Sequence, residues 1–303
     1  MITTRTNVPL SKKTFYGIGG PADELIEIED PSELGELWAE TIAQNIPKII
    51  LGKGSNMAFS DKGFRGRVFL PLFDEIHHHS QNQEYLHRVT VDVGCNFQKF
   101  IEDTNKEGFE DLCPLSGIPG NVGGFIRGNA GAYGAEIKDF VTEVQYFDEN
   151  GLHQKISGKE AEFEYRGSLF KKNPNLFILR ATFTLQKRNE PETCLTKSKT
   201  LLQERWKKYP PGRSGGCVFK NPGPEKGLLA GKILDEMGAK GDRLGDMEIS
   251  QEHANFIVNK GEGKQADLIA LMKRWQKKVQ AQQGVTLEPE IYLIDELGER
   301  ISF

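Results

Sequence analysis

Apolar and polar positions in the first third of the chain follow two alternating patterns, one typical of strands and one typical of helices. Strand patterns occupy residues 22–30, 48–57, 65–72 and 87–95. Helix-like patterns occupy residues 32–44, opened by Pro31 and Ser32, and residues 96–108, where Asn96 is the predicted N-cap. This alternation predicts βαβ patterning at the start of the chain.

The middle of the chain continues with strand patterns and then turns polar. Residues 140–157 predict a hairpin whose turn lies at Glu149-Asn150-Gly151, and residues 176–188 predict the strand that follows it. Residues 189–198 are polar and contain a proline. We take this polar stretch as the boundary between two domains.

Helical patterns dominate the last third of the chain. Helices are predicted at residues 194–210, 228–241 and 265–284, and strands at residues 216–222, 253–261 and 284–295. The predicted fold class is therefore α+β with two domains, residues 1–188 and residues 199–303. The final strands are candidates to pack back on the first domain.

Residues 113–134, CPLSGIPGNVGGFIRGNAGAYG, concentrate seven glycines with two prolines and two asparagines. Glycine costs conformational entropy on folding, and a flexible linker would not need the apolar residues threaded through this stretch. We therefore expect backbone that approaches a large, flat or polyanionic ligand closely and offers its N–H groups as donors.

A second glycine-containing motif, LGKGSN at residues 51–56, lies where a predicted strand runs into a turn. It lacks the third glycine of G-x-G-x-x-G, which disfavours a standard Rossmann dinucleotide site. Elsewhere in the chain, residues 227–233 do not have the spacing of a phosphate-binding P-loop. Alone, the motif is equally consistent with an ordinary tight turn. Together with residues 113–134, it favours two glycine-rich loops that hold a dinucleotide from both sides.

Composition narrows the class of protein. The chain has 303 residues and a net charge of −4, which disfavours nucleic acid as a partner. No apolar run approaches the ~20 residues of a membrane span, and the first residues lack the apolar core of a secretory signal. The four cysteines, Cys95, Cys113, Cys194 and Cys217, are far apart. They suggest neither a disulfide framework nor a zinc site, so we expect a cytoplasmic protein without a membrane partner.

Three consecutive histidines, His77 to His79, are the most conspicuous candidates for metal ligands. No acidic residue or cysteine stands near them at a recognisable ligand spacing. The sequence therefore favours a solvated loop or an edge strand here, and it predicts no metal site.

Three polar residues lie in apolar surroundings, and each has two interpretations. Arg166 lies between aromatic residues and is either functional or a surface arginine paired with Glu162 or Glu164. Cys217 follows two glycines and is either functional or a small buried apolar residue. Glu290 begins an apolar strand and is either functional or on its solvent face, like Glu288.

Eight motifs in order together carry a resemblance to a known family. They are GIGGPA, LGKGSN, SGIPGNVGG, NAGAYG, YRGSLFK, GCVFKNP, SQEHANFIVN and LEPEI, and they span nearly the whole chain. The sequence resembles the UDP-N-acetylenolpyruvoylglucosamine reductases, flavoenzymes of bacterial peptidoglycan precursor synthesis, in their shorter, type II-like branch. The resemblance implies a vanillyl-alcohol-oxidase-type FAD-binding domain at residues 1–188 and a substrate-binding domain at residues 199–303.

The sequence departs from the family pattern at a few positions. Cys217 stands where the family commonly has serine, although cysteine also occurs there. Gly17 replaces the usual basic residue before the first IGG, and Arg127 and Gly128 replace more apolar residues. The cysteine at position 217 bears on the chemistry of the residue that the resemblance implies as the proton donor. The other departures bear only on local contacts.

The resemblance also implies the residues of the site. FAD would be held by two sets of residues: Gly52, Lys53, Gly54, Ser55 and Asn56 in the first loop, and Ser116, Gly120, Gly123, Gly124, Asn129 and Gly131 in the second. NADPH would be the co-substrate. Asn221 and His253 would face the UDP-sugar or the nicotinamide.

Arg166, Cys217 and Glu290 are implied as the catalytic residues. Hydride attack on the enolpyruvyl methylene leaves negative charge on the neighbouring carbon and the carboxylate. A guanidinium such as that of Arg166 binds a carboxylate through two hydrogen bonds. Cys217 would protonate the carbon, because an ordinary thiol with a pKa of ~8.5 carries its proton at neutral pH. Glu290 would share the role of Arg166 and would help most if it were protonated.

Two other functions remain as alternatives. The first is an oxidase on the same flavin fold that uses O₂, although neither LGKGSN nor its flanks offer a histidine or cysteine for covalent flavin attachment. The second is a non-catalytic module that binds a nucleotide sugar. The sequence leaves the oligomeric state open.

Overall fold

Two compact units make up the described part of the chain, which the computed structural model gives as residues 1–79, 86–223 and 227–303. Unit 1 comprises Met1–Thr4, Ile26–Gly52 and Val68–Arg205. Unit 2 comprises Arg5–Leu25, Lys53–Arg67 and Trp206–Phe303. These limits differ from the predicted domains, residues 1–188 and 199–303, because two N-terminal segments fold with the C-terminal third.

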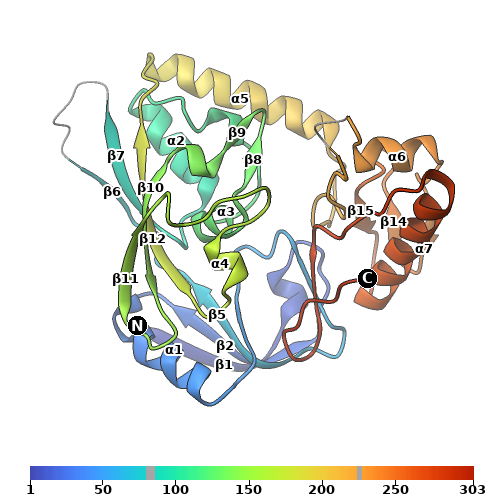
Figure 1. The fold of residues 1–303 in the computed structure, drawn as a ribbon, viewed down its shortest axis with the longest axis horizontal. Helices are drawn as coiled ribbons and strands as arrows, with labels where there is room; N and C mark the ends of the chain where they lie inside the picture. Colours follow the sequence, from blue (N-terminus) through green and yellow to red (C-terminus); the bar gives the residue numbers. More distant parts are fainter. Residues whose placement is uncertain (80–85, 224–226) are drawn as a thin grey trace. The chain divides into compact units, whose positions relative to one another are not determined.

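An antiparallel sheet of five strands forms the centre of unit 1, in the order β11-β10-β12-β7-β6 (Figure 1). Its strands are β6 (Ile76–His78), β7 (His87–Asp92), β10 (Val141–Phe147), β11 (His153–Ser157) and β12 (Phe177–Leu185). The predicted hairpin is confirmed as β10 and β11. His77 and His78 lie in the edge strand β6 and His79 directly follows it, so the edge strand is the one of the two predicted alternatives that the structure shows.

The helices of unit 1 are α1 (Leu34–Ala43), α2 (Phe97–Lys106), α3 (Val122–Gly128), α4 (Leu169–Lys172) and α5 (Pro191–Lys208). Asn96 caps α2 as predicted, because its side chain accepts the N–H of Gln98 at 3.0 Å. The rings of Phe97 and Phe125 stack with their centroids 3.7 Å apart, so α3 is anchored on α2. Helix α5 includes most of the polar stretch that was predicted as a domain boundary.

A second sheet has four strands in the order β1-β2-β5-β3. Its strands are β1 (Ile2–Pro9), β2 (Pro21–Ile28), β5 (Phe64–Pro71) and β3 (Lys48–Ile50). The sequence did not predict β1, because most of its side chains are polar and exposed. The shortest elements are η1 (Leu10–Lys13), η2 (Pro31–Glu33), η3 (Cys113–Leu115), η4 (Ile137–Asp139), β8 (Gly131–Ala132) and β9 (Ala135–Glu136).

Unit 2 is built around its long C-terminal helix. Its elements are β4 (Met57–Phe59), α6 (Ala230–Glu236), β13 (Arg243–Leu244), β14 (Met247–Ile249), β15 (Ile257–Asn259), α7 (Gln265–Gln283) and β16 (Tyr292–Ile294). Helix α7 buries Leu268, Met272, Trp275 and Val279, as its apolar spacing predicts. It ends at Gly284, whose φ of 67° is the left-handed conformation typical of a helix end.

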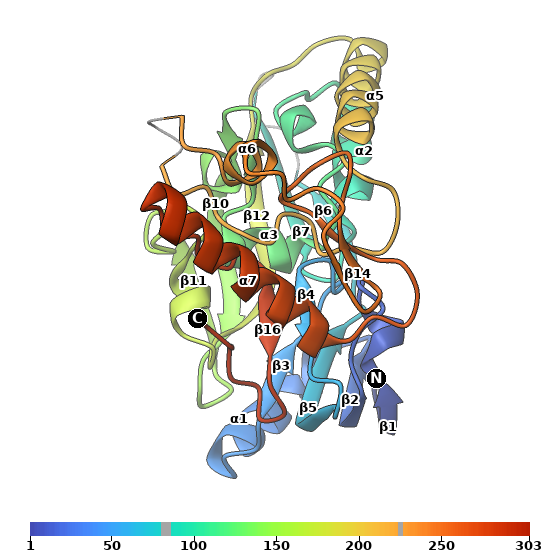
Figure 2. The same cartoon turned by 90° about the vertical axis from the view of Figure 1, so that its right-hand side faces the viewer.

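A parallel pair of strands joins two segments of unit 2 that are far apart in the chain. Strand β16 pairs with β4, and Figure 2 shows both strands close to α7. The side chain of Gln265, which is 5% exposed, donates to the carbonyls of Ala58 at 2.7 Å and Ile294 at 2.8 Å. One buried amide therefore links α7 to both strands.

No helix among the described residues is both long and apolar enough to cross a membrane.

Replacing Gln265 by leucine should lower the free energy of unfolding by about 1–3 kcal/mol, because two carbonyls lose their buried amide donor. Gln282→Leu in the exposed last turn of α7 is the matched control and should change it by less than about 0.5 kcal/mol. Thermal and urea denaturation measure both variants. Equal unfolding midpoints for the two variants would contradict the assigned role of Gln265.

Candidate active site

The glycine-rich stretch contains a helix that the sequence did not predict. Residues 122–128 form α3, although three of its seven residues are glycines. A Cβ added at Gly124 or Gly128 would meet no atom within 4 Å, so neither glycine is required for packing among the described residues. One face of α3 therefore presents bare backbone beside open space, as a flat ligand requires.

The two glycine-rich loops meet at Asn121, which precedes α3. A Cβ on Gly52, from the LGKGSN motif, would lie 3.7 Å from the Cβ of Asn121. The Oδ1 atom of Asn121 is buried and has no hydrogen-bond partner among the described residues. A buried acceptor of this kind suits a ligand that carries hydroxyl or N–H donors. The sequence missed Asn121 because only the fold places it beside Gly52.

The first N–H groups of α3 do not remain available as donors, contrary to the expectation from the sequence. The N–H of Val122 donates to the carbonyl of Cys95 at 2.9 Å, and the N–H of Gly123 donates to the carbonyl of Val93 at 3.0 Å. The part of α3 that stays open is its backbone surface near Gly124.

Several predicted FAD residues hold the loops in shape. A Cβ on Gly123 would lie 3.1 Å from the Cβ of Val93, and one on Gly131 would lie 2.8 Å from the side chain of Glu136. Gly54 has a φ of 63°, and a Cβ there would lie 2.2 Å from the carbonyl of Lys13. Gly54 and Gly131 thus lie too close to other parts of the protein for a side chain, and Gly123 packs tightly against Val93.

The remaining predicted FAD residues have the following positions. Lys53, Ser55 and Asn56 lie in the loop between β3 and β4, and the carbonyl of Asn56 accepts the N–H of Tyr292 at 3.0 Å. Gly120 is buried, and its carbonyl accepts the N–H of Phe97 at 3.1 Å.

Ser116 and Asn129 are fully buried. The hydroxyl of Ser116 lies 2.7 Å from that of Ser198. Asn129 ends α3 in the left-handed conformation, and its side-chain amide donates to the carbonyl of Glu164 at 3.0 Å and accepts from the N–H of Lys138 at 3.2 Å. Both side chains therefore support the loop from within the protein.

Arg166 lies in a tight turn beside this loop. The backbones of Glu164 and Gly167 exchange hydrogen bonds of 3.1 and 3.0 Å across the turn, and Arg166 has a φ of 57°. A left-handed arginine is strained, and strain of this kind concentrates at functional sites. Asn129 binds Glu164, and the hydroxyl of Ser168 donates to the carbonyl of Arg127 at 2.9 Å, so the turn is fixed against the end of α3.

The two carboxylates that were alternative partners for Arg166 lie close to a lysine. Glu162 and Glu164 are 3.3 and 3.7 Å from the ammonium group of Lys172. The guanidinium of Arg166 lies 5.3 Å from the ring centre of Tyr165, and its side chain is half-buried. The left-handed backbone of its turn is the feature of Arg166 that supports a functional role.

Cys217 differs from the other three cysteines. Cys95, Cys113 and Cys194 are fully buried, and burial raises the pKa of each thiol, to about 12 for Cys95 and Cys113. Cys217 is partly exposed and lies in unit 2, where it pairs with Phe256 as an isolated bridge. Cys217 is therefore the most accessible of the four thiols.

Glu290 lies on the segment beside Cys217. Its N–H donates to the carbonyl of Val218 at 2.8 Å, so the two segments run side by side. Glu290 is half-buried, whereas the side chain of Glu288 is 66% exposed and pairs with Lys220 at 3.0 Å. The two glutamates share strand parity but differ in environment, and Glu288 has the position of a surface residue.

Asn221 and His253 meet at the start of α6. The side chain of Asn221 accepts the N–H of Ala230 at 3.0 Å, and a Cβ on Gly231 would lie 2.8 Å from the ring of His253. Burial lowers the pKa of His253, which favours the neutral ring. The two predicted substrate residues thus lie beside consecutive residues at the start of α6.

Tyr16 is a further residue that the sequence did not single out. It is fully buried in unit 2, and burial raises the pKa of its hydroxyl far above the ordinary value. A Cβ on Gly215 would lie 2.3 Å from its ring, so Gly215 makes room for Tyr16. The contact joins residues far apart in the chain, and the sequence carries no signal for it.

Comparison with known proteins identifies the family. Residues 22–157 match the model of an FAD-binding domain, and residues 206–294 match that of the C-terminal domain of UDP-N-acetylenolpyruvoylglucosamine reductase. The reductase of this name from Lachnoclostridium phytofermentans is 36% identical over 98% of this chain and 93% of its own. The chain belongs to the UDP-N-acetylenolpyruvoylglucosamine reductase family.

Other members of the family agree with this assignment. The UDP-N-acetylenolpyruvoylglucosamine reductase of Chlamydia felis is 37% identical over 96% of this chain and 95% of its own. The crystal structure of the reductase from Thermus caldophilus superposes with a TM-score of 0.78 at 31% identity, over 97% of this chain and 98% of that one. The predicted α+β fold with an FAD-binding domain is confirmed, and the chain is an FAD-containing oxidoreductase.

Replacing Gly124 by valine should abolish flavin retention in this reductase, because the branched side chain would fill the open space beside α3. The chain itself should still fold, since no described atom outside the nearby backbone of α3 lies within 4 Å of the new Cβ. Flavin released per chain on denaturation measures the loss, and circular dichroism measures the fold.

Gly123→Val is the matched variant for this experiment. Its Cβ would lie 3.1 Å from that of Val93, so it should lower folding stability as well as flavin content. Full flavin occupancy in Gly124→Val would show that the open face of α3 does not contact the cofactor.

Proposed function

We propose that this reductase uses NADPH to reduce the enolpyruvyl group of UDP-N-acetylglucosamine enolpyruvate, giving UDP-N-acetylmuramate for peptidoglycan precursor synthesis in the cytoplasm. The observation that carries the proposal is the neighbourhood of residues 217–221 in unit 2. This one segment has Glu290 beside Cys217 at its start and His253 near Asn221 at its end.

FAD suits the loops of this chain, because α3 has an open glycine face and Asn121 offers a buried acceptor without a partner. Gly52, Asn121 and Gly124 would hold the cofactor. When bound, FAD supplies the transfer of hydride from NADPH to the enolpyruvyl double bond.

Arg166 is proposed to bind the carboxylate of the enolpyruvyl group. Its guanidinium stays charged at any physiological pH and donates two parallel hydrogen bonds to a carboxylate. Negative charge develops on this carboxylate during the reaction, so a positioned cation lowers the barrier. The strained turn holds the arginine backbone in place before the substrate arrives.

Cys217 is proposed to donate a proton from Sγ to the carbon next to the carboxylate. A partly exposed thiol can reach a bound substrate, whereas the three buried thiols cannot. Glu290 is proposed to act with Arg166 on the substrate carboxylate. When it carries a proton, this half-buried carboxyl can donate a hydrogen bond to the substrate carboxylate.

Asn221 and His253 are proposed to contact the nucleotide-sugar substrate or the nicotinamide. The neutral ring of His253 offers one donor and one acceptor, and its Nδ1 already accepts the N–H of Asn255 at 3.2 Å. Nε2 then carries the ring proton and is the atom that can donate to a ligand.

Arg166→Lys and Glu290→Gln should each slow the reduction of the enolpyruvyl substrate by ~10²-fold or more, because each removes one preorganised stabiliser of developing charge. The oxidation of NADPH in the first half-reaction should change little. Glu288→Gln is the matched control, because its carboxylate lies in an exposed ion pair with Lys220. Unchanged turnover in Arg166→Lys or Glu290→Gln would remove that residue from the catalytic set.

The two substitutions Cys217→Ser and Cys217→Ala should have different effects. Serine keeps an O–H group near the same place and should retain substantial activity. Alanine has no proton to donate, so the step that consumes substrate should slow by ~10²–10⁴-fold. Stopped-flow absorbance should show rapid loss of the flavin band with NADPH and slow recovery with the enolpyruvyl substrate.

The alternative interpretation of Cys217, as a small buried apolar residue, predicts a different outcome. If Cys217 only fills space, both variants should have a modestly lower free energy of unfolding, and both should keep the activity of the enzyme. Rapid recovery of the flavin band in Cys217→Ala, in D₂O as in H₂O, would exclude Cys217 as the proton donor.

A further inference from the structure

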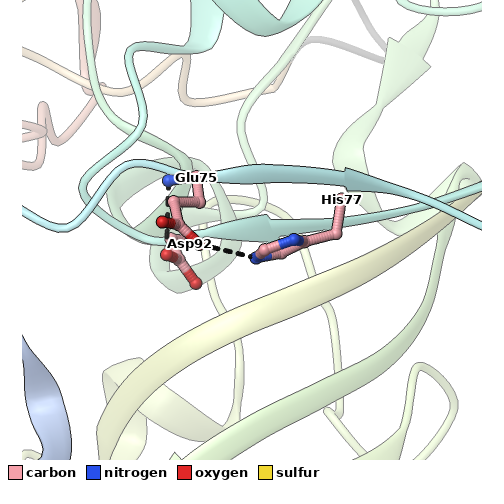
Figure 3. A group of neighbouring side chains, drawn as sticks. All are labelled: Glu75, His77 and Asp92. Atoms are coloured by element: carbon pink, nitrogen blue, oxygen red, sulfur yellow. Dashed lines mark hydrogen bonds and ion pairs between the residues drawn. The ribbon is translucent and has the colours of Figure 1, made fainter.

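Glu75, His77 and Asp92 form a cluster at the edge of the five-stranded sheet of unit 1 (Figure 3). Strand register explains the cluster. His77 pairs with Thr90 in β7, and the N–H of Asp92 donates to the carbonyl of Glu75 at 3.0 Å, so Glu75 lies opposite Asp92. Residues 75 and 77 share a face because side chains alternate along a strand. The sequence could not show this, because Asp92 comes from the neighbouring strand.

The ligand atoms of the three side chains lie within 4.8 Å of one another. The Nε2 atom of His77 is 3.1 Å from Oε2 of Glu75. Ligands of a tetrahedral zinc ion, with bonds of about 2.0–2.1 Å, are separated by roughly 3.4 Å. Glu75 and His77 are exposed, so small changes of rotamer can bring their ligand atoms to this spacing.

Asp92 is the fixed member of the cluster. It is 3% exposed, its Oδ2 accepts the N–H of Glu75 at 3.2 Å, and its Oδ1 lies 3.1 Å from the guanidinium of Arg180 without a hydrogen bond in good geometry. An ionised carboxylate has about four lone-pair sites, so Asp92 keeps acceptor capacity for a further cation.

The surroundings of the cluster are acidic. Glu75 and Asp92 line a cavity of about 740 Å³ within unit 1. The charged and titratable side chains of its wall are Glu29, Asp30, Asp74, Glu75, Asp92, His153 and Arg180. Asp74 pairs with Lys99 at 3.1 Å, so four further carboxylates against one guanidinium give the cavity a negative field that concentrates cations.

We infer that Glu75, His77 and Asp92 bind a divalent transition-metal ion, with zinc as the reference case, and that water completes the coordination. One imidazole and two carboxylates suit zinc and its neighbours better than magnesium, which prefers oxygen ligands alone. None of the three ligands is among the residues assigned to FAD, NADPH or the sugar substrate.

The ion would link the exposed edge strand to β7. Two ligands come from residues 75–77 and the third from Asp92 at the end of β7. A ligand that binds only the folded protein stabilises it in proportion to the logarithm of its concentration above Kd. The metal should therefore raise the unfolding temperature of unit 1 without altering the turnover of substrate.

Isothermal titration of the FAD-loaded, chelator-treated enzyme with Zn²⁺ tests the inference. We expect one saturable site whose affinity falls at least about tenfold in His77→Ala and in Glu75→Gln, because even supporting residues of metal sites contribute 10–100-fold. Both side chains are exposed, so neither variant should unfold the protein. Thermal unfolding with and without Zn²⁺ gives a second readout.

His79→Ala and His78→Ala are the matched controls. The ring of His79 bonds to Thr90 at 2.8 Å, and that of His78 lies between His87 at 2.9 Å and Asp103 at 2.7 Å. Both variants should bind Zn²⁺ as the parent does. Absence of a saturable site in the parent would overturn the inference, as would equal loss of binding in either control and in His77→Ala.

Discussion

The proposed chemistry depends on one segment of backbone, residues 217–221, that is fixed along both edges. On one edge the buried side-chain amide of Asn255 binds the backbone of Phe219. It accepts the N–H of Phe219 at 3.0 Å and donates to the carbonyl of Phe219 at 2.8 Å. On the other edge Val218 accepts the N–H of Glu290 at 2.8 Å. A buried amide whose donor and acceptor are both satisfied permits one arrangement of its neighbours, so Cys217 and Glu290 are held in register before any ligand binds.

A second asparagine has the same role in unit 1. Asn129 ends α3 and reaches the carbonyl of Glu164, so the open glycine helix and the turn of Arg166 form one structure. The left-handed backbone of Arg166 costs on the order of 1–3 kcal/mol, and such a cost persists only where surrounding contacts impose it. Each unit thus positions its proposed catalytic side chains through the backbone, by a buried amide, and leaves the reactive groups accessible.

Local patterns in the sequence predicted most elements, because spacing and caps determine a helix or hairpin such as β10 and β11. They missed α3, since glycine-rich composition hides a helix that Phe125 anchors through tertiary packing. Residues 216–222 were predicted as a strand, but in the structure they form isolated bridges to Phe256 and Pro289 in place of a regular strand. The family motifs named Cys217 and Glu290, but the contact of Asn121 with Gly52 and the cluster around Asp92 depend on register, which a single sequence does not encode locally.

An anaerobic titration tests the central claim most directly, that a flavin held by this chain passes hydride from NADPH to the enolpyruvyl sugar nucleotide. The purified protein should be yellow, NADPH should bleach the flavin band, and stoichiometric UDP-N-acetylglucosamine enolpyruvate should restore it without O₂. A colourless protein that FAD does not reconstitute would contradict the account. So would a bleached flavin that only O₂ restores, because that result identifies an oxidase.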